Sequence, residues 1–261
     1  MSPFLLALLA LVGLGSGFVD AIAGGGGLLT LPSLALAGLD PVTAVATNKL
    51  ASTFGSGSAT FAFWRAGKID RSMAPSALTA CAGAALGALA LPWAPRGFLN
   101  AALPVVLAAV AVYFALAPNL TEAQRRPRLS PGAFAVTLAP AIGFYDGVFG
   151  PGAGSFYMIG FVVLAGFGLT RAIAGARFAN FGSNVGSLAL YALSGHIVVP
   201  AGLAMGAGAF LGARLGAHAA LRAGARLVRP LIVVISCAMA LRLMAAPGGL
   251  LAGAWKSAFG G

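Results

Sequence analysis

The sequence GFVDAIAGGGG at residues 17–27 has a counterpart, GFYDGVFGPGAG, at residues 143–154. Each copy is an apolar segment that carries one aspartate and then breaks at a run rich in glycine. A second pair of blocks, from LAG to ATNK at residues 36–49 and from LAG to AGAR at residues 164–177, follows in the same order at nearly the same separation. Two matched pairs in order predict an internal duplication of the chain.

The composition excludes a soluble protein. Of 261 residues, 59% are hydrophobic and only 8% are charged, whereas soluble domains carry about 25% charged residues. The mean hydropathy of +0.95 predicts an all-α polytopic membrane protein with lipid as its outer solvent. The net charge of +11 does not indicate nucleic-acid binding, because the basic residues lie in short gaps between apolar runs rather than on a wettable face.

Most of the apolar stretches are near the roughly 20 residues that a helix needs to cross a membrane. They cover approximately residues 3–22, 26–38, 41–64, 75–93, 98–117, 131–149, 153–169, 172–195, 199–217 and 227–245. The second and the seventh are short, and each follows a glycine-rich break. Broken backbone cannot face lipid, since its amide and carbonyl groups would lack partners. The breaks are therefore expected inside the protein, near the membrane midplane.

The basic loops predict the orientation. By the positive-inside rule the cytoplasmic clusters are Arg65, Lys68 and Arg71; Arg125, Arg126 and Arg128; and Arg222, Arg226 and Arg229. The first repeat is expected at residues 1–118 and the second at 132–261, with a basic cytoplasmic linker at 119–131. The basic loops fall at different places in the two halves, which favours inverted repeats with both termini outside. If the broken segments only re-enter the membrane, the count falls from ten to eight spans and the argument for inversion weakens.

Four charges stand inside apolar runs at repeat-matched positions: Asp20 with Asp146, and Lys49 with Arg177. Each intramembrane charge costs about 2.5–3.5 kcal/mol on insertion scales. Such charges need either a polar cavity or mutual pairing. The structural alternative is that Lys49 pairs with Asp20, and Arg177 with Asp146, only to fix helix packing.

The neighbouring side chains favour an anion site. Arg177, Asn180 and Asn184 share one helical face, and Lys49, Ser52 and Ser56 repeat this spacing in the first half. Free amide groups at a glycine-rich helix start attract anions. The further candidate substrate-binding residues are Asn48, the glycines Gly24, Gly25, Gly26, Gly27, Gly150, Gly152 and Gly154, and Tyr145, which either donates to the substrate or only packs.

The patterns of other chemistries are missing from the sequence. No strand pattern precedes the Gly24 run and no Lys-Ser or Lys-Thr follows it, which excludes a phosphate-binding loop. No nucleophile elbow with partners is visible, and no metal-ligand spacing surrounds the cysteines or histidines. We therefore expect no enzyme, no catalytic residues, no metal and no cofactor.

The motifs resemble those of the sulfite exporter TauE/SafE family of membrane permeases. They are GFVDAIAGGGG at 17–27, PVTAVATNKLASTFGSGSATFAFWRAGKID at 41–70, GFYDGVFGPGAGSF at 143–156, ARFANFGSN at 176–184 and GHIV at 195–198. The resemblance covers almost the whole chain. It implies a bacterial inner-membrane (plasma-membrane), multi-pass protein of two repeated halves that moves sulfur-containing anions such as sulfite or organosulfonates. Relatives often have lysine where this chain has Arg177, and a guanidinium can donate two hydrogen bonds to one oxyanion.

The sequence thus predicts a secondary transporter for small anions, driven by an ion gradient. Asp20 and Asp146 are the candidates for proton coupling, or they tune the charges of Lys49 and Arg177. A coupling sodium ion and a homo-oligomer in the lipid remain open. The alternatives are a passive anion channel, and a membrane-embedded enzyme or assembly factor that binds an anion without moving it.

Overall fold

The computed structural model describes residues 1–93 and 126–223, and in this part of the chain it contains helices and no strand. The α-helices are α1 (Pro3–Ala23), α2 (Gly27–Leu36), α3 (Pro41–Arg65), α4 (Ala74–Ala90), α6 (Pro131–Val136), α7 (Leu138–Val148), α8 (Ala153–Val163), α9 (Leu169–Ser194) and α10 (Val199–Ala223). Two short 3-10 helices, η1 (Arg71–Met73) and η2 (Leu91–Trp93), flank α4. The predicted stretches 98–117 and 227–245 lie outside the described residues.

Local sequence signals explain where the helices begin and end. Ser2 and Asp40 accept hydrogen bonds from the first turns of α1 and α3, and a proline follows each cap. Gly24 ends α1 at φ 90°, and Gly150 follows α7 at φ 89°. This left-handed conformation is open to glycine at little cost. Gly24 and Gly150 thus have the same conformation at matched positions, whereas Gly26 before α2 is right-handed (φ −56°) and Gly152 before α8 is left-handed (φ 75°).

One predicted element is divided in the structure. The apolar stretch 131–149 forms two helices, α6 and α7, with the interruption at Thr137. Pro140 has no amide hydrogen to donate to the carbonyl group of Val136, so a continuous helix would lose a bond there. At the matched position of the first half stands Leu14, and α1 is continuous.

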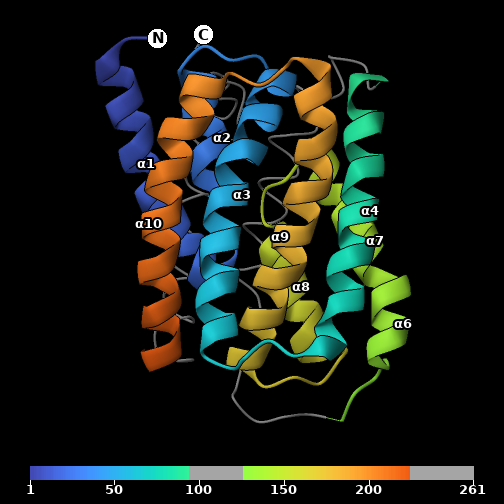
Figure 1. Cartoon of the computed structure of the whole chain (residues 1–261). Coiled ribbons are helices and arrows are strands. Elements are labelled where there is room, and N and C mark those ends of the chain that lie inside the picture. Colours follow the sequence, from blue (N-terminus) through green and yellow to red (C-terminus); the bar gives the residue numbers. More distant parts are fainter. Residues whose placement is uncertain (94–125, 224–261) are drawn as a thin grey trace, which may run out of the picture.

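Helices of the two halves pack in a crossed arrangement (Figure 1). α1 packs on α10 and α7 packs on α4, while α3 and α9 contact each other at the centre. α1, α3 and α10 run from the upper to the lower end of the view, whereas α4, α7 and α9 run the opposite way. Small residues permit close contact: a Cβ atom on Gly212 would lie 1.9 Å from the carbonyl oxygen of Leu14, and one on Gly83 would lie 2.1 Å from that of Pro140.

The surface and the interior have the polarity of a membrane protein. Large apolar side chains project outwards from several helices, such as Phe4, Leu36, Leu78 and Leu193, the last of them 86% exposed. The interior instead holds charged and amide groups, including Lys49 and Arg177. By length and hydropathy together, two described helical segments could cross a membrane, Pro3–Ala23 and Arg71–Ala90. The long helices α3, α9 and α10 are less apolar; in α3 and α9, polar side chains are turned inwards.

The exposed basic residues in the described part of the chain gather at one end of the bundle. The loop from α3 to η1, the start of α6 and the end of α10 all lie at the lower end in Figure 1. They carry Arg65, Lys68, Arg71, Arg126, Arg128 and Arg222. The amide group of Arg128 donates to the carbonyl group of Leu164 at the end of α8, which holds this segment against the bundle. Arg125, Arg226 and Arg229 lie outside the described residues.

Candidate functional site

The two glycine-rich breaks face each other inside the bundle. A Cβ atom on Gly24 would lie 2.3 Å from the amide nitrogen of Ser155, and one on Gly27 would lie 3.1 Å from the Cα of Pro151. The hydroxyl group of Ser155 donates to the carbonyl group of Ala23. The end of α1 and the start of α8, one from each half of the sequence, therefore meet backbone to backbone, and only glycine permits this approach.

Two buried ion pairs cross between the halves. Lys49 Nζ lies 2.7 Å from Asp146 Oδ1, and Arg177 Nη1 lies 2.8 Å from Asp20 Oδ2. Both cationic side chains are only 1% exposed. The predicted partners, Lys49 with Asp20 and Arg177 with Asp146, are therefore wrong, whereas the mutual pairing of these four charges that the alternative expected is present. The crossed packing of α1, α3, α7 and α9 places each cation beside the other half's carboxylate.

Asp20 occupies the place that the sequence predicted for a bound anion. Its carboxylate accepts a hydrogen bond from the amide group of Gly26 (3.1 Å) in the first break and another from Arg177. Arg177 also donates to the main-chain carbonyl group of Asp20 (2.6 Å). The Asp20 side chain is 21% exposed. This carboxylate thus binds both an arginine and the amide group of Gly26 at the start of α2, while remaining partly accessible.

Asp146 is enclosed instead. Its carboxylate is 2% exposed, and besides Lys49 it accepts hydrogen bonds from the hydroxyl group of Ser183 and from Asn180 Nδ2 (3.4 Å). Three donors converge on this carboxylate, so the Lys49–Asp146 pair has the satisfied surroundings that a buried charge requires.

The predicted polar rows of α3 and α9 form one connected network. Asn184 accepts from Lys49 Nζ (3.3 Å) and its amide group lies within hydrogen-bond distance of Ser56 Oγ and Asn180 Oδ1 (both 3.3 Å). On the first half, Asn48 Oδ1 accepts from Thr30 (2.5 Å) and from Ser52 (3.4 Å).

A small polar cavity lies among these groups. Its volume is about 20 Å³, which is room for about one water molecule. It is lined by Asp20, Gly24, Gly27, Asn48, Ser52, Asp146, Gly150, Gly154, Asn180 and Asn184. The lining residues come from both breaks and from both central helices. Of the two ion pairs, the carboxylates line this cavity and the cations do not.

The guanidinium group of Arg177 lies directly against Gly154. A Cβ atom on Gly154 would lie 2.3 Å from Nη2 and 2.8 Å from Nη1. Arg177 Nε is buried and has no hydrogen-bond partner in the described part of the chain. A buried donor without a partner costs free energy. Arg177 Nε could therefore donate a hydrogen bond to a further acceptor, which would remove this cost.

The comparisons with known proteins identify the family. The sequence profile of the sulfite exporter TauE/SafE family matches residues 9–243. The chain belongs to the sulfite exporter TauE/SafE family. It is 48% identical to the "Probable membrane transporter protein ORF9" of Sinorhizobium sp over 93% of this chain and 94% of that protein.

Two further family members are similar over most of their length. The "Probable membrane transporter protein YfcA" of Escherichia coli K12 is 42% identical over 94% of this chain and 91% of its own. A "Probable membrane transporter protein" of Haemophilus influenzae is 40% identical over 92% and 94%. No solved structure matches the chain significantly.

In this family member, the remaining predicted residues lie in or beside the breaks. The hydroxyl group of Tyr145 donates to the carbonyl group of Pro151 (2.6 Å). The carbonyl group of Gly25 accepts from Leu28, and Gly152, at φ 75°, precedes α8. Within the described residues, no group of three His, Cys, Asp or Glu side chains could hold a metal ion.

Sequence reasoning missed three polar residues of the site. Thr30 binds Asn48, Ser183 binds Asp146 and Ser155 joins the two breaks. Ser183 could have been found from its spacing, because it lies three residues after Asn180. The other two have no such signal, since isolated hydroxyl groups are common in apolar helices.

Proposed function

We propose that the protein, a membrane transporter of the sulfite exporter TauE/SafE family, carries small anions across the bacterial inner membrane. The site lies where the two glycine-rich breaks meet, and sulfur-containing oxyanions such as sulfite or organosulfonates are its substrates. One observation carries the proposal. A buried arginine and a free helix-start amide group jointly hold a partly exposed carboxylate, Asp20, as they would hold a substrate oxyanion.

The proposed framework is a pair of inverted repeats, each spanning the membrane several times. Its support is the crossed packing, in which α1 lies on α10 as α7 lies on α4, with matched helices running in opposite directions (Figure 1). The short helices α2 and α8 have 10 and 11 residues and are about 15 Å long. This is half of the hydrocarbon thickness, so both would end near the midplane, where transporters of inverted-repeat design bind substrate.

The proposed binding step is an exchange of acceptors on Arg177. A substrate oxyanion replaces the Asp20 carboxylate, taking hydrogen bonds from the guanidinium group and from the amide group of Gly26. Arg177 Nε is a further donor that has no partner in the described residues. A planar guanidinium with several donors suits an oxyanion better than a single ammonium group does. The cavity must widen for this exchange, since it now holds about one water molecule.

The proposed coupling ion is a proton carried by Asp20. Protonation removes the negative charge that competes for Arg177, so substrate and proton would bind together. Asp20 is the candidate rather than Asp146 because its carboxylate is 21% exposed, against 2% for Asp146. The Lys49–Asp146 pair would hold the two halves together and supply positive potential.

Flux measurements test this function. Purified protein in liposomes should accumulate radiolabelled sulfite when a pH gradient is imposed, and an Asp20→Asn variant should lose the response to the gradient. Protein-free liposomes and Asp40→Asn, a substitution of an acidic residue outside the site, are the controls. Uptake of sulfite and of each alternative anion equal to that of protein-free liposomes would contradict transport.

A counterflow experiment separates a carrier from a passive channel. Internal unlabelled sulfite should accelerate the entry of labelled sulfite, because the binding site of a carrier returns to the outer side faster with substrate bound than when it is empty. A channel would give no acceleration. Binding without any flux would instead support the membrane-embedded enzyme or assembly factor.

A further inference from the structure

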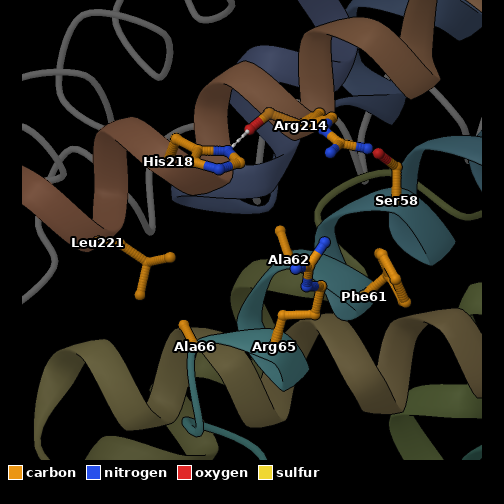
Figure 2. A pocket seen from close by; sticks show the side chains of 8 residues that line it. All are labelled: Ser58, Phe61, Ala62, Arg65, Ala66, Arg214, His218 and Leu221. Carbon is orange, nitrogen blue, oxygen red and sulfur yellow. Dashed lines mark hydrogen bonds between the residues drawn. The ribbon is translucent and has the colours of Figure 1, made fainter.

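A second, larger cavity lies at the basic end of the bundle, between α3 and α10 (Figure 2). Its volume is about 380 Å³, far larger than that of the central cavity. The described residues that line it are Ser58, Phe61, Ala62, Arg65, Ala66, Arg214, His218 and Leu221. None of these residues belongs to the proposed anion-transport site.

The charged groups of this cavity are positive and lack acidic partners among the residues that the structure describes. The ion pairs between described residues involve Lys49, Arg171 and Arg177, and neither Arg65 nor Arg214. The guanidinium carbon of Arg65 lies 5.9 Å from the ring centroid of Phe61 on the preceding turn, a cation–π distance. Figure 2 shows the two arginines on opposite helices of the cavity wall.

His218 is fixed against its own helix. Its Nδ1 lies 2.7 Å from the carbonyl oxygen of Arg214, so this nitrogen carries the hydrogen and donates it (Figure 2). The two arginines, which stay charged at all physiological pH values, give the cavity positive charge. A ligand of this cavity must supply negative charge.

Apart from Ser58 and His218, the rest of the cavity wall is apolar, and exposed apolar side chains lie on the same helices. Phe61, Ala62 and Leu221 contribute to the wall, while Trp64 is 61% exposed beside it. Leu215 on α10 is likewise 59% exposed. Exposed tryptophan next to arginine is typical of the membrane–water interface. A freely dissolved anion would gain nothing from these apolar surfaces, whereas an amphiphile would use both kinds of surface.

We propose that this cavity binds the headgroup of an anionic phospholipid. Arg65 and Arg214 would hold the phosphate group from opposite sides, and the glycerol and acyl chains would follow the apolar wall onto the surface of α3 and α10. Basic cavities between membrane helices on the cytoplasmic side are suited to such headgroups. The lipid would tie α3 of the first half to α10 of the second. The site does not depend on which anion the protein transports.

Lipid titration of delipidated protein tests the proposal. Phosphatidylglycerol added to the protein in detergent should raise the apparent melting temperature, and phosphatidylcholine should not. Each arginine would donate a charge-assisted hydrogen bond to the phosphate group, which the exposed loop charges would not make. Losing one such bond, in Arg65→Gln or Arg214→Gln, should weaken apparent phosphatidylglycerol affinity at least about tenfold, and losing both should weaken it at least about 100-fold.

Matched controls distinguish this site from general charge attraction. Lys68→Gln/Arg71→Gln removes two exposed positive charges from the same end of the bundle and should keep the wild-type lipid affinity. Arg65→Lys/Arg214→Lys keeps the charge and should retain most of the response. The melting temperature of each variant is first compared with that of the wild type in phosphatidylcholine, to show that the variant folds. If the double variant does not fold, the two single variants are used to test the proposal.

Three outcomes would overturn the proposal. The first is equal stabilisation of the wild type by phosphatidylglycerol and phosphatidylcholine. The second is unchanged phosphatidylglycerol affinity in Arg65→Gln/Arg214→Gln, or an equal loss in the Lys68→Gln/Arg71→Gln control. The third is full competition by soluble glycerol phosphate at equal concentration, which would assign the cavity to a free anion instead of a lipid.

Discussion

Asp20 and Asp146 hold the same place in the two halves of the sequence, yet their carboxylates have different surroundings. The buried Asp146 carboxylate pairs with Lys49 and accepts hydrogen bonds from Ser183 and Asn180. The Asp20 carboxylate pairs with Arg177, accepts a hydrogen bond from one main-chain amide group, and remains 21% exposed. The matched positions were evident from the sequence, and the difference between them is what the structure adds. This difference supports a division of roles, in which the Asp20–Arg177 pair binds and releases the substrate while the Lys49–Asp146 pair holds the two halves together.

The enclosed pair makes a prediction about stability. Lys49→Met should destabilise the protein by about 3–5 kcal/mol, because it leaves the Asp146 carboxylate buried without its partner. Lys49→Met/Asp146→Asn removes both charges and should recover most of this loss. Thermal unfolding in detergent, followed by circular dichroism, measures the difference. Equal stability of the single and double variants would contradict a buried pair in which each charge compensates the other.

At the scale of the elements, the two glycine-rich breaks decide the geometry of the site. The sequence correctly placed these breaks, and φ values of 90° at Gly24 and 89° at Gly150 match. The contact between the breaks could not be predicted, because it depends on the crossed packing of helices far apart in the chain. For the same reason the ion-pair partners were assigned wrongly. Pro140 was visible in the sequence, but periodicity alone did not separate α6 from α7.

The second break makes a prediction about Arg177. Gly154→Ala would place a methyl group 2.3 Å from Arg177 Nη2, so the guanidinium group must leave its position beside Asp20. Anion binding should fall at least about tenfold, the effect of losing about 1.4 kcal/mol. Gly15→Ala on α1 is the matched control, because nothing lies within 4 Å of its added methyl group. Binding to Gly154→Ala as tight as to the wild type, measured by calorimetry, would show that this position of Arg177 is not needed.

A surface pair between elements makes a prediction about pH. At the basic end, Arg171 Nη2 of α9 lies 2.5 Å from Asp70 Oδ2, and the hydroxyl group of Ser72 also donates to Asp70. The hydrogen bond from Ser72 and the contact with Arg171 lower the pKa of Asp70 below its usual value. Stability from this carboxylate is therefore present above the usual aspartate pKa of about 3.9. It is lost as the pH falls through the lowered pKa.

Asp70→Asn should remove this part of the acid sensitivity. The effect is below about 1 kcal/mol, because the pair is exposed and screened by solvent. Melting temperatures of the wild type and the variant, measured between pH 3 and pH 6, should converge as the pH falls. A constant difference across this range would mean that ionised Asp70 contributes nothing.

At the scale of the whole molecule, charge and apolar surface are sorted by position. The basic loops gather at one end, the exposed apolar side chains cover the helices, and four ionised groups, Asp20, Lys49, Asp146 and Arg177, meet in the interior. The few charged residues in the sequence already predicted that basic loops lie on one side of the membrane and that four charges lie inside the protein. The second cavity was not predicted, because Arg65 is distant in the sequence from Arg214 and His218, and these residues share no motif.

The orientation makes a prediction about labelling. In a variant whose cysteines are replaced by serine, a cysteine at Lys68 should react with impermeant maleimide only after the inner membrane is opened. A cysteine at Ser194, at the opposite end of the bundle, should react in intact spheroplasts. Labelling of both sites from the same side would contradict the positive-inside orientation.

The central claim is that Arg177 holds a substrate oxyanion in the place that the Asp20 carboxylate now occupies. Calorimetric titration with sulfite at neutral pH, with sulfate, thiosulfate and sulfoacetate in parallel, tests it most directly. Asp20→Asn removes the competing charge and should bind the substrate at least about tenfold more tightly than the wild type. Asp20→Asn/Arg177→Gln, which removes the pair without leaving a buried charge, should not bind. Equal affinity of the wild type and Asp20→Asn, or retained binding in the double variant, would contradict the claim.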